Sequence, residues 1–569
     1  MDIAAFRQAR LRQLANLKTP RSLPPRPAAT APPAAPRGMQ SGLAPYNGSW
    51  GKQQVTHLLK RTMFGATREH IDYLLGLSLD DAVDALLAIP PEAEPPINNY
   101  HFPDLENPII DPNIPPGEVW VNDDYVDDVY VAYGRFISLK TWWIRLMIDQ
   151  PLGIFEKMTL FWCNHFGTQF GELFEGRFNY RHLSTLRQHA LGNFKAMAHA
   201  ITIDPQMLVY LNGAYNQAGA PDENYARELQ ELFCIGKGPD SGYTEDDVQA
   251  AARVLTGWRI NWDQNTESLF DPWLHDTDPK QFSGFYNNTI INGQTGANGA
   301  NELDQMLNMI FATTECAKFV CRKLYRFFVY HTIDATTESL VITPLANIFR
   351  DNNYNITPVL RALFKSEHFF DVANRGAMIK TPIDYLVGAF REFDIQRPNP
   401  SLISDNYELL KYMYWNMDGM LMGIGDPPNV AGWPAYYQAP SYNKYWVTTA
   451  TLPSRALRTD EMLYWGYDVF GNRIKINPVA ITAQIPNAQD PTLLVNAVLS
   501  WMLAVPVSDT VKQNMKNELL SGQTSDYYWT DAWNEYLANP TDEMAYGTVE
   551  SRLKSMYYIL MHLEEYQLM

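Results

Sequence analysis

The sequence predicts an all-α fold: one large body of many helices with long irregular loops, at most a small β-hairpin, and an extended Pro-rich arm at the N-terminus. From residue 51 onward, apolar residues recur at spacings of three and four, the period of a helix with one buried face. Alternating, strand-like runs are weak and local. With 569 residues and a hydrophobic content of 46%, the chain can bury a thick core without disulfides.

The N-terminal segment differs in composition from the rest. Residues 1–45 hold seven Lys or Arg and one acid, a net charge of +6 in a chain of net charge −18. Residues 20–45 contain eight prolines, which favour an extended, polyproline-like chain. We therefore expect residues 1–50 to form an arm. It is either a disordered tail, a transit peptide, or a segment that docks on an acidic neighbour and makes a homo-oligomer through residues 1–45.

An acidic interval follows this basic arm. Between Arg68 and Arg135 there are fifteen Asp or Glu and no Lys or Arg. Three interpretations stay open: a solvated surface, a docking strip for a basic arm, or a calcium site in segment 104–128, although EF-hand spacing is missing. The acidic body argues against a nucleic-acid partner, because phosphates would be repelled.

Targeting and cysteine signals are few. No stretch approaches 18 consecutive apolar residues, so we expect no transmembrane segment. No signal peptide is visible at the start of the chain, and a cytoplasmic location is the default expectation. Four cysteines without a CxxC pair predict free buried thiols rather than a zinc ribbon or a redox motif.

The helical body is expected to span residues 51–569. Beyond its first three helices, the ranges with helical spacing are 153–165, 180–203, 222–235, 245–257, 302–330, 338–350, 356–365, 378–394 and 405–422, with three or four more helices in 490–569. Residues 282–293 predict the small hairpin. The Pro-rich QRPNPS run predicts a sub-boundary near 396–404.

The most informative stretch is Pro221–Trp258. In its first half, one helical face is apolar, and Glu228 and Glu231 lie on the opposite face, three residues apart. That face is either an ordinary solvated surface or the wall of a cleft that binds a metal or shares a proton, since paired carboxylates suit both tasks. In its second half, Thr244 and Asp247 predict a capping box at a new helix start.

Motifs along the whole chain resemble one bacterial family. Besides residues 221–258, they are HLLKRTMFGAT at 57–67, EKMTLFWCNHFGT at 156–168, the helical run at 186–213, HDTDPKQFSG at 275–284, CRKLYRFFV at 321–329, IKTPIDYLVG at 379–388 and PPNVAGWP at 427–434. In this order they resemble the family catalogued as "domain of unknown function 1800". The resemblance implies a mostly helical body and no known reaction. It also implies a partner from the "domain of unknown function 1501" family, whose twin-arginine signals would allow co-export.

A metal site is the sharpest functional hypothesis. His165, Glu228, Glu231 and His275, with Asp276 nearby, are suitable ligands for zinc, iron or manganese, and Glu228 and Glu231 are the candidate catalytic groups. The family motif usually reads Trp-His-Asn-His-Phe, whereas this chain has Cys163 at the first His position, as a thiolate ligand or a space filler.

Three functions are therefore compatible with the sequence. The first is a metal-dependent enzyme with a His and carboxylate site between helices. The second is a non-enzymatic helical scaffold or escort in a protein complex that docks through its basic arm. The third is a polysaccharide- or polymer-binding protein that uses aromatic loops, with Trp258, Trp262, Trp273, Trp433 and Trp446 as its surface residues. No P-loop, GxSxG, HExxH or haem-attachment motif is present.

Overall fold

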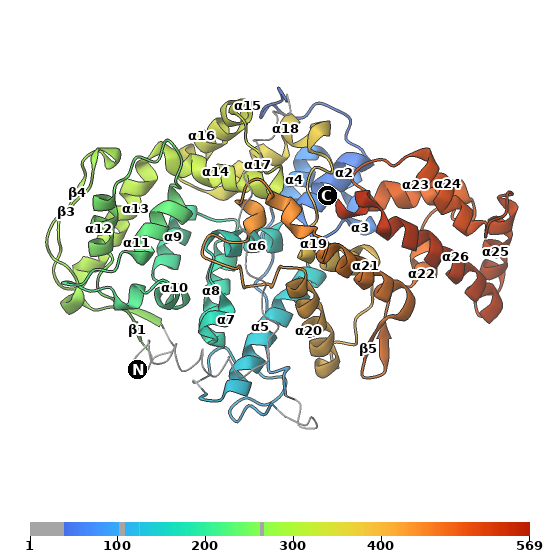
Figure 1. The fold of residues 1–569 in the computed structure, drawn as a ribbon, viewed down its shortest axis with the longest axis horizontal. Coiled ribbons are helices and arrows are strands. Elements are labelled where there is room, and N and C mark those ends of the chain that lie inside the picture. Colours follow the sequence, from blue (N-terminus) through green and yellow to red (C-terminus); the bar gives the residue numbers. More distant parts are fainter. Residues whose placement is uncertain (1–38, 102–108, 124–125, 262–266) are drawn as a thin grey trace.

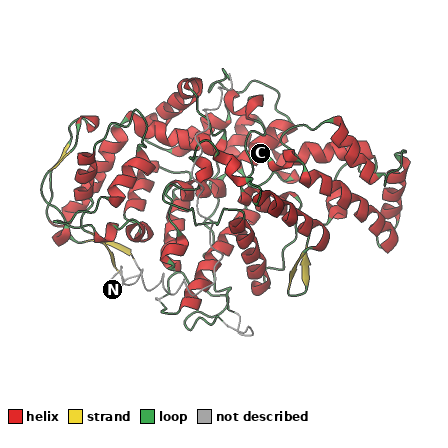
Figure 2. Cartoon of the chain, in the orientation of Figure 1, coloured by secondary structure: helices red, strands yellow, loops and turns green. Residues whose placement is uncertain are grey.

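The structure is a computed structural model that describes residues 39–101, 109–123, 126–261 and 267–569. Most of the predicted N-terminal arm therefore lies outside the described residues. The helices form an elongated body in which three groups lie side by side (Figure 1). Helices dominate all three groups (Figure 2), which confirms the predicted fold class.

The central group contains the first helices of the body and the helices between residues 314 and 419. They are α2 (Lys52–Thr62), α3 (Arg68–Leu75), α4 (Leu79–Leu86), α5 (Val129–Asp149), α6 (Phe155–His165), α7 (Phe170–Leu173), α8 (Gly176–Gln188), α14 (Thr314–Phe328), α15 (Ala335–Thr337), α16 (Thr343–Asp351), α17 (Ile356–Phe364), α18 (Glu367–Phe370), α19 (Pro382–Glu392) and α20 (Ile403–Gly419).

The two outer groups flank this centre in Figure 1. One consists of α9 (Phe194–Thr202), α10 (Pro205–Tyr210), α11 (Asn224–Glu228), the π-helix η2 (Leu229–Cys234), α12 (Glu245–Val254) and α13 (Glu302–Ala312). The other consists of α21 (Thr451–Asp460), α22 (Pro478–Ala483), α23 (Pro491–Met502), α24 (Asp509–Leu519), α25 (Tyr527–Ala538) and α26 (Glu543–His562).

Two of the long predicted helices are interrupted by capping residues. The range 180–203 breaks before α9, because the Asn193 side chain accepts a hydrogen bond from the Ala196 backbone N–H at 3.0 Å. The range 302–330 breaks in the same way at Thr313, which caps α14. The side chains of Ser, Thr and Asn accept hydrogen bonds from backbone N–H groups and so favour the starts of helices. A helix break of this kind leaves the apolar spacing unchanged, so periodicity alone does not reveal it.

Strands form three two-stranded antiparallel sheets in the described residues. The predicted hairpin is present, with β3 (Lys280–Gln281) paired to β4 (Ile290–Ile291). Two further hairpins were not predicted: β1 (Trp258–Asn261) with β2 (Glu267–Phe270), and β5 (Tyr467–Val469) with β6 (Asn472–Ile474). All three are short connections on a helical body.

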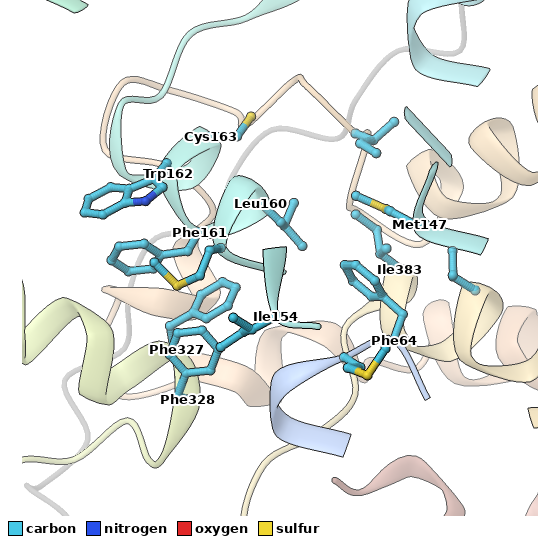
Figure 3. Packing of buried hydrophobic residues seen from close by; sticks show 14 of the residues in the cluster. Phe64, Met147, Ile154, Leu160, Phe161, Trp162, Cys163, Phe327, Phe328 and Ile383 are labelled. Carbon is cyan, nitrogen blue, oxygen red and sulfur yellow. The ribbon is translucent and has the colours of Figure 1, made fainter. Parts of the chain in front are cut away.

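A large hydrophobic core joins the three groups. One cluster of buried residues extends from Val55 to Tyr566, on both sides of the predicted sub-boundary near 396–404, which stays a prediction. Figure 3 shows Phe161 from α6 and Phe327 from α14 within this core, with their ring centroids 5.3 Å apart. Over the described ranges, no helix combines the length and apolar character needed to cross a membrane.

Candidate functional site

A cleft of about 350 Å³ opens where four of the sequence motifs meet. It lies between α6, η2, α14 and the loop that precedes residue 438. Its lining residues are Phe161, Asn164, Glu231, Leu232, Lys237, Phe319, Lys323, Arg326, Phe327, Ala431, Tyr436 and Tyr437. Cleft volumes of this order suit small molecules. We call it the Lys323 cleft.

A close approach of two loops shapes the cleft wall. The Asn164 side chain accepts a hydrogen bond from the Trp433 backbone N–H at 2.8 Å. Gly432 has φ +93°, and a Cβ there would lie 2.4 Å from the Asn164 carbonyl oxygen. The WCNHFG and PPNVAGWP motifs therefore pack directly against each other, and their contact leaves no room for a side chain at Gly432.

The carboxylate-rich helix ends in a π turn beside the cleft. α11 gives way to η2 at Leu229, and such turns are frequent at functional sites. The last carbonyls of a helix lack partners within it, and here two side chains supply donors. Lys323 Nζ donates to the Leu232 carbonyl at 2.8 Å, and His165 Nε2 lies 2.9 Å from the Phe233 carbonyl.

Lys323 is the most perturbed cation of the cleft. Burial, assisted by the charge of Arg326, lowers the pKa of its amine to about 7. The ammonium position lies 5.1 Å from the centre of the Phe319 ring. Among the described residues Lys323 forms no ion pair, so no carboxylate holds it in the charged form. A large fraction of Lys323 is therefore a neutral amine at neutral pH.

The two glutamates lie on the face that the helical projection predicts. Tyr225 and Leu229 are buried on the apolar stripe, whereas Glu228 and Glu231 are only half-buried. Glu231 lines the cleft and pairs with Lys237 at 2.5 Å. Burial and then repulsion by Glu231 raise the pKa of Glu228 above its ordinary value. The face is thus neither fully solvated nor fully covered.

His165 is a buried helix cap. It is 0% exposed and is surrounded by aromatic rings, among them Phe161, Phe194 and Phe233. Burial, followed by the charge of Lys323, holds the pKa of His165 well below its usual value. Its Nε2 is committed to the Phe233 carbonyl, and its Nδ1 has no partner among the described residues. His165 fixes the end of η2.

His275 lies in a separate buried network. Its Nδ1 is 2.9 Å from the Thr256 carbonyl, and its Nε2 is 3.0 Å from a carboxylate oxygen of Glu302. Glu302 also pairs with Lys280 at 2.6 Å, and all three ionisable side chains are at most 1% exposed. This network ties the loop before β3 to the start of α13.

Asp276 is also engaged locally, because Arg253 of α12 donates to both of its oxygens at 2.7 and 3.0 Å. Of the five predicted ligand residues, Glu231 lines the Lys323 cleft, His165 and Glu228 lie on elements beside it, and His275 and Asp276 belong to the loop before β3. Within the described ranges, no group of three or more His, Cys, Asp or Glu is arranged to hold a metal ion. Zinc, iron or manganese binding stays a prediction.

Cys163 and the acidic segment have local explanations. Burial raises the pKa of the Cys163 thiol to about 12, so at neutral pH it is a thiol that fills space in the core.

In segment 104–128, Asp111 and Asp123 both pair with Arg135, at 2.9 and 2.5 Å. Other acids of that segment, among them Asp104, lie outside the described residues, and calcium binding there stays a prediction.

The aromatic loops contribute mainly to the core. Of the four tryptophans of this set that the structure describes, Trp433 and Trp446 are each 1% exposed and Trp273 is 92% exposed. Trp262 lies outside the described residues. Two of the five tryptophans proposed as binding surface therefore pack inside the protein.

Sequence reasoning did not single out Lys323 or Arg326 as site residues. Both belong to the CRKLYRFFV motif, which was noted only as part of a family resemblance. The available signal was the presence of three cations in a short, otherwise apolar helix segment. That signal does not reveal which of them is buried beside a cleft.

Comparison with known proteins gives a family but no activity. A family model described as "Protein of unknown function (DUF1800)" matches residues 57–568. No curated protein and no solved structure matches the chain.

Proposed function

The chain belongs to the DUF1800 family of proteins of unknown function, and on that premise we propose that it is an enzyme acting on a small molecule in the Lys323 cleft. The Lys323 amine would serve as the proton acceptor. The observation that carries the proposal is an amine with a pKa of about 7, without an ion-pair partner among the described residues, in the wall of a cleft. A general base is most effective when its pKa lies near the working pH.

The surroundings of Lys323 support this role. The Leu232 carbonyl, 2.8 Å from Nζ, orients the amine and stabilises the ammonium that forms after proton transfer. The end of η2 and the face of the Phe319 ring also favour a positive charge at this point. The Leu232 carbonyl and the Phe319 ring would thus stabilise the ammonium formed by proton transfer without having to move.

The rest of the cleft indicates the substrate class. Its walls carry Phe161, Phe319 and Phe327, which favour an apolar body. Arg326 lines the same cleft and forms no ion pair among the described residues, so its guanidinium can receive a carboxylate or a developing enolate oxygen. We infer a small carbonyl or carboxylate compound with an acidic C–H bond.

Ligand capture tests this proposal. The purified chain is incubated with a bacterial metabolite extract, separated by ultrafiltration and analysed by mass spectrometry. We expect enrichment of a small acid or carbonyl compound by the wild type and at least ~10-fold less by Lys323→Met, as expected for the loss of one strong polar contact. Lys318→Met, on the same helix but outside the cleft, should capture like the wild type. Equal capture by all three proteins would refute the proposal.

We propose as a second function that a metal binds at Glu228 and Glu231. Burial and then repulsion by Glu231 raise the pKa of Glu228, and a bound cation would relieve that repulsion. Elemental analysis of protein purified without chelator or nickel tests it. We expect a stoichiometric divalent transition metal that is lost in the Glu228→Gln/Glu231→Gln double variant. Metal-free protein would contradict it.

The escort function is supported by one contact of the arm. The arm's last residues join the body through backbone hydrogen bonds, from Glu367 N to Ala44 O at 2.8 Å and from His368 N to Gly42 O at 3.1 Å. These bonds hold residues 42–44 beside α18. Removing residues 1–45 and measuring the mass in solution tests the predicted oligomer, and an unchanged number of copies per particle would contradict it.

A further inference from the structure

A second cavity, of about 520 Å³, lies between the central helices and the C-terminal group. It is an open cavity bordered by α3, the end of α5, α19, the Pro-rich loop at 394–400, α22 and α23. None of its lining residues lines the Lys323 cleft. The QRPNPS run, which the sequence marked as a boundary, forms part of its wall.

Unpaired polar atoms gather in this cavity. Six buried side-chain atoms in its lining have no hydrogen-bond partner among the described residues, namely Arg68 Nη1, His70 Nδ1, Gln150 Nε2, Gln150 Oε1, Arg391 Nε and Glu392 Oε2. Gln150 is only 8% exposed and Arg391 only 9%, so bulk water does not satisfy them. Buried polar groups in proteins are nearly always paired. Their concentration around one hollow indicates a bound polar molecule.

Two arginines of the lining offer donors to an anion, in a wall that also carries Glu69, Asp149, Glu392 and Asp394. Arg391 Nη1 donates to the Ile148 and Gln150 carbonyls at 2.6 and 3.0 Å, which fixes the guanidinium at the end of α5. Neither Arg391 nor Arg68 forms an ion pair with a carboxylate in the described part of the chain. Arg397, by contrast, is paired with Asp149 at 2.5 Å. Arg68 and Arg391 therefore have no bonded carboxylate in the described residues, and Arg391 feels the charges of Asp149 and Glu392 only from a distance.

The remaining groups call for hydrogen-bond donors on the ligand. The side-chain amide oxygen of Gln150 (Oε1) and Glu392 Oε2 are unpaired acceptors, and Glu392 is already paired with Lys60 through its other oxygen. Burial, followed by the charge of Arg391, lowers the pKa of His70 to about 4, so the imidazole is neutral and adds no further positive charge. A matching ligand carries one anionic group for the arginines and hydroxyl donors for the acceptors.

We propose that this cavity binds a small hydroxylated anion, either a hydroxy acid or a sugar phosphate, through Arg68, Gln150 and Arg391. The anionic group lies between the two arginines, and a hydroxyl donates to Gln150. Because the lining is separate from the Lys323 cleft, the inference does not depend on the function proposed for that cleft.

Isothermal titration calorimetry on the full chain tests the inference with four probes: malate, succinate, glycerol 3-phosphate and inorganic phosphate. We expect malate or glycerol 3-phosphate to bind with a Kd below about 1 mM. Each should bind more tightly than its counterpart without hydroxyls. Preference for malate would identify a carboxylate site, and preference for glycerol 3-phosphate a phosphate site.

Variants decide whether binding occurs in this cavity. Arg68→Gln should weaken binding by at least ~10-fold, because a charge-assisted hydrogen bond is lost. Gln150→Leu should remove the preference for the hydroxylated probe. Arg473→Gln, which changes an exposed arginine paired with Asp468, should leave binding unchanged. Should Arg68→Gln fail to fold, Gln150→Leu decides alone. Absence of binding by all four probes, or equal affinity in wild type and variants, would overturn the inference.

Discussion

Replacing Lys323 by Met tests the electrostatics of the cleft through the stability of the chain. Burial and the Arg326 charge lower the pKa of this amine from 10.5 to about 7. Between these values the unfolded chain holds a proton that the folded chain has released, so the free energy of unfolding rises with pH. The charged amine therefore lowers the free energy of unfolding by its full amount below pH 7. This loss of stability disappears completely only above pH 10.5.

The size of the effect follows from the pKa. At about 1.36 kcal/mol for each pH unit, the difference between the two pKa values corresponds to about 5 kcal/mol. Contact with the cleft solvent and the loss of the hydrogen bond to the Leu232 carbonyl reduce the net gain, and we expect Lys323→Met to be more stable than the wild type by roughly 2–4 kcal/mol near neutral pH.

Urea unfolding at constant ionic strength, from about pH 6 to about pH 10, measures this difference. The advantage of Lys323→Met should shrink toward high pH, because the folded wild type has released its proton there while the unfolded chain still holds it. Lys318→Met, on the same helix but outside the cleft, serves as the control. Parallel stability curves for wild type and Lys323→Met would refute the reasoning.

Three further predictions concern the packing and the charges around the Lys323 cleft and the His275 network. Gly432→Ala should cost about 2–4 kcal/mol in urea unfolding, since its Cβ would lie 2.4 Å from the Asn164 carbonyl oxygen, whereas Gly471→Ala, at φ +89° with open space around it, should cost only about 1 kcal/mol; equal losses would contradict the close approach. Glu302→Gln should cost about 3–5 kcal/mol, because it leaves the buried Lys280 ammonium without its carboxylate, and a thermal unfolding midpoint close to that of the wild type would contradict the buried network. Glu228→Gln should raise the thermal unfolding temperature at pH 7 but not at pH 4, because burial and a neighbouring carboxylate raise the pKa of Glu228 and so make the charged form costly in the folded state; no gain at pH 7 would refute this assignment.

The local structure of residues 221–258 could be predicted because each of its features has a cause a few residues away. Thr244 and Asp247 form the predicted capping box, with both reciprocal hydrogen bonds present. Gly257 stands just beyond the following helix with φ +98°, as expected of a stop. The placement of Glu228 and Glu231 opposite the apolar stripe likewise follows from the 100° helical period.

What covers that face could not be predicted, because it comes from distant parts of the chain. Lys323 reaches the Leu232 carbonyl across 91 positions of sequence. Its neutral character arises from burial, which exists only after α14, η2 and the loop at 431–437 have packed together. For the same reason, the sequence could propose His165 and His275 as joint ligands, although folding gives them different partners, the Phe233 carbonyl and Glu302.

Competitive acetylation of the native chain tests the central claim most directly, namely that the cleft holds an accessible neutral amine at Lys323. Trace acetic anhydride is added over a range of pH, and peptide mass spectrometry measures the labelling of Lys323 relative to a free lysine peptide, whose pKa is about 10.4. The account predicts half-maximal labelling of Lys323 at a pH of about 7. A midpoint near that of the free peptide, or no labelling of the folded protein at any pH, would contradict it.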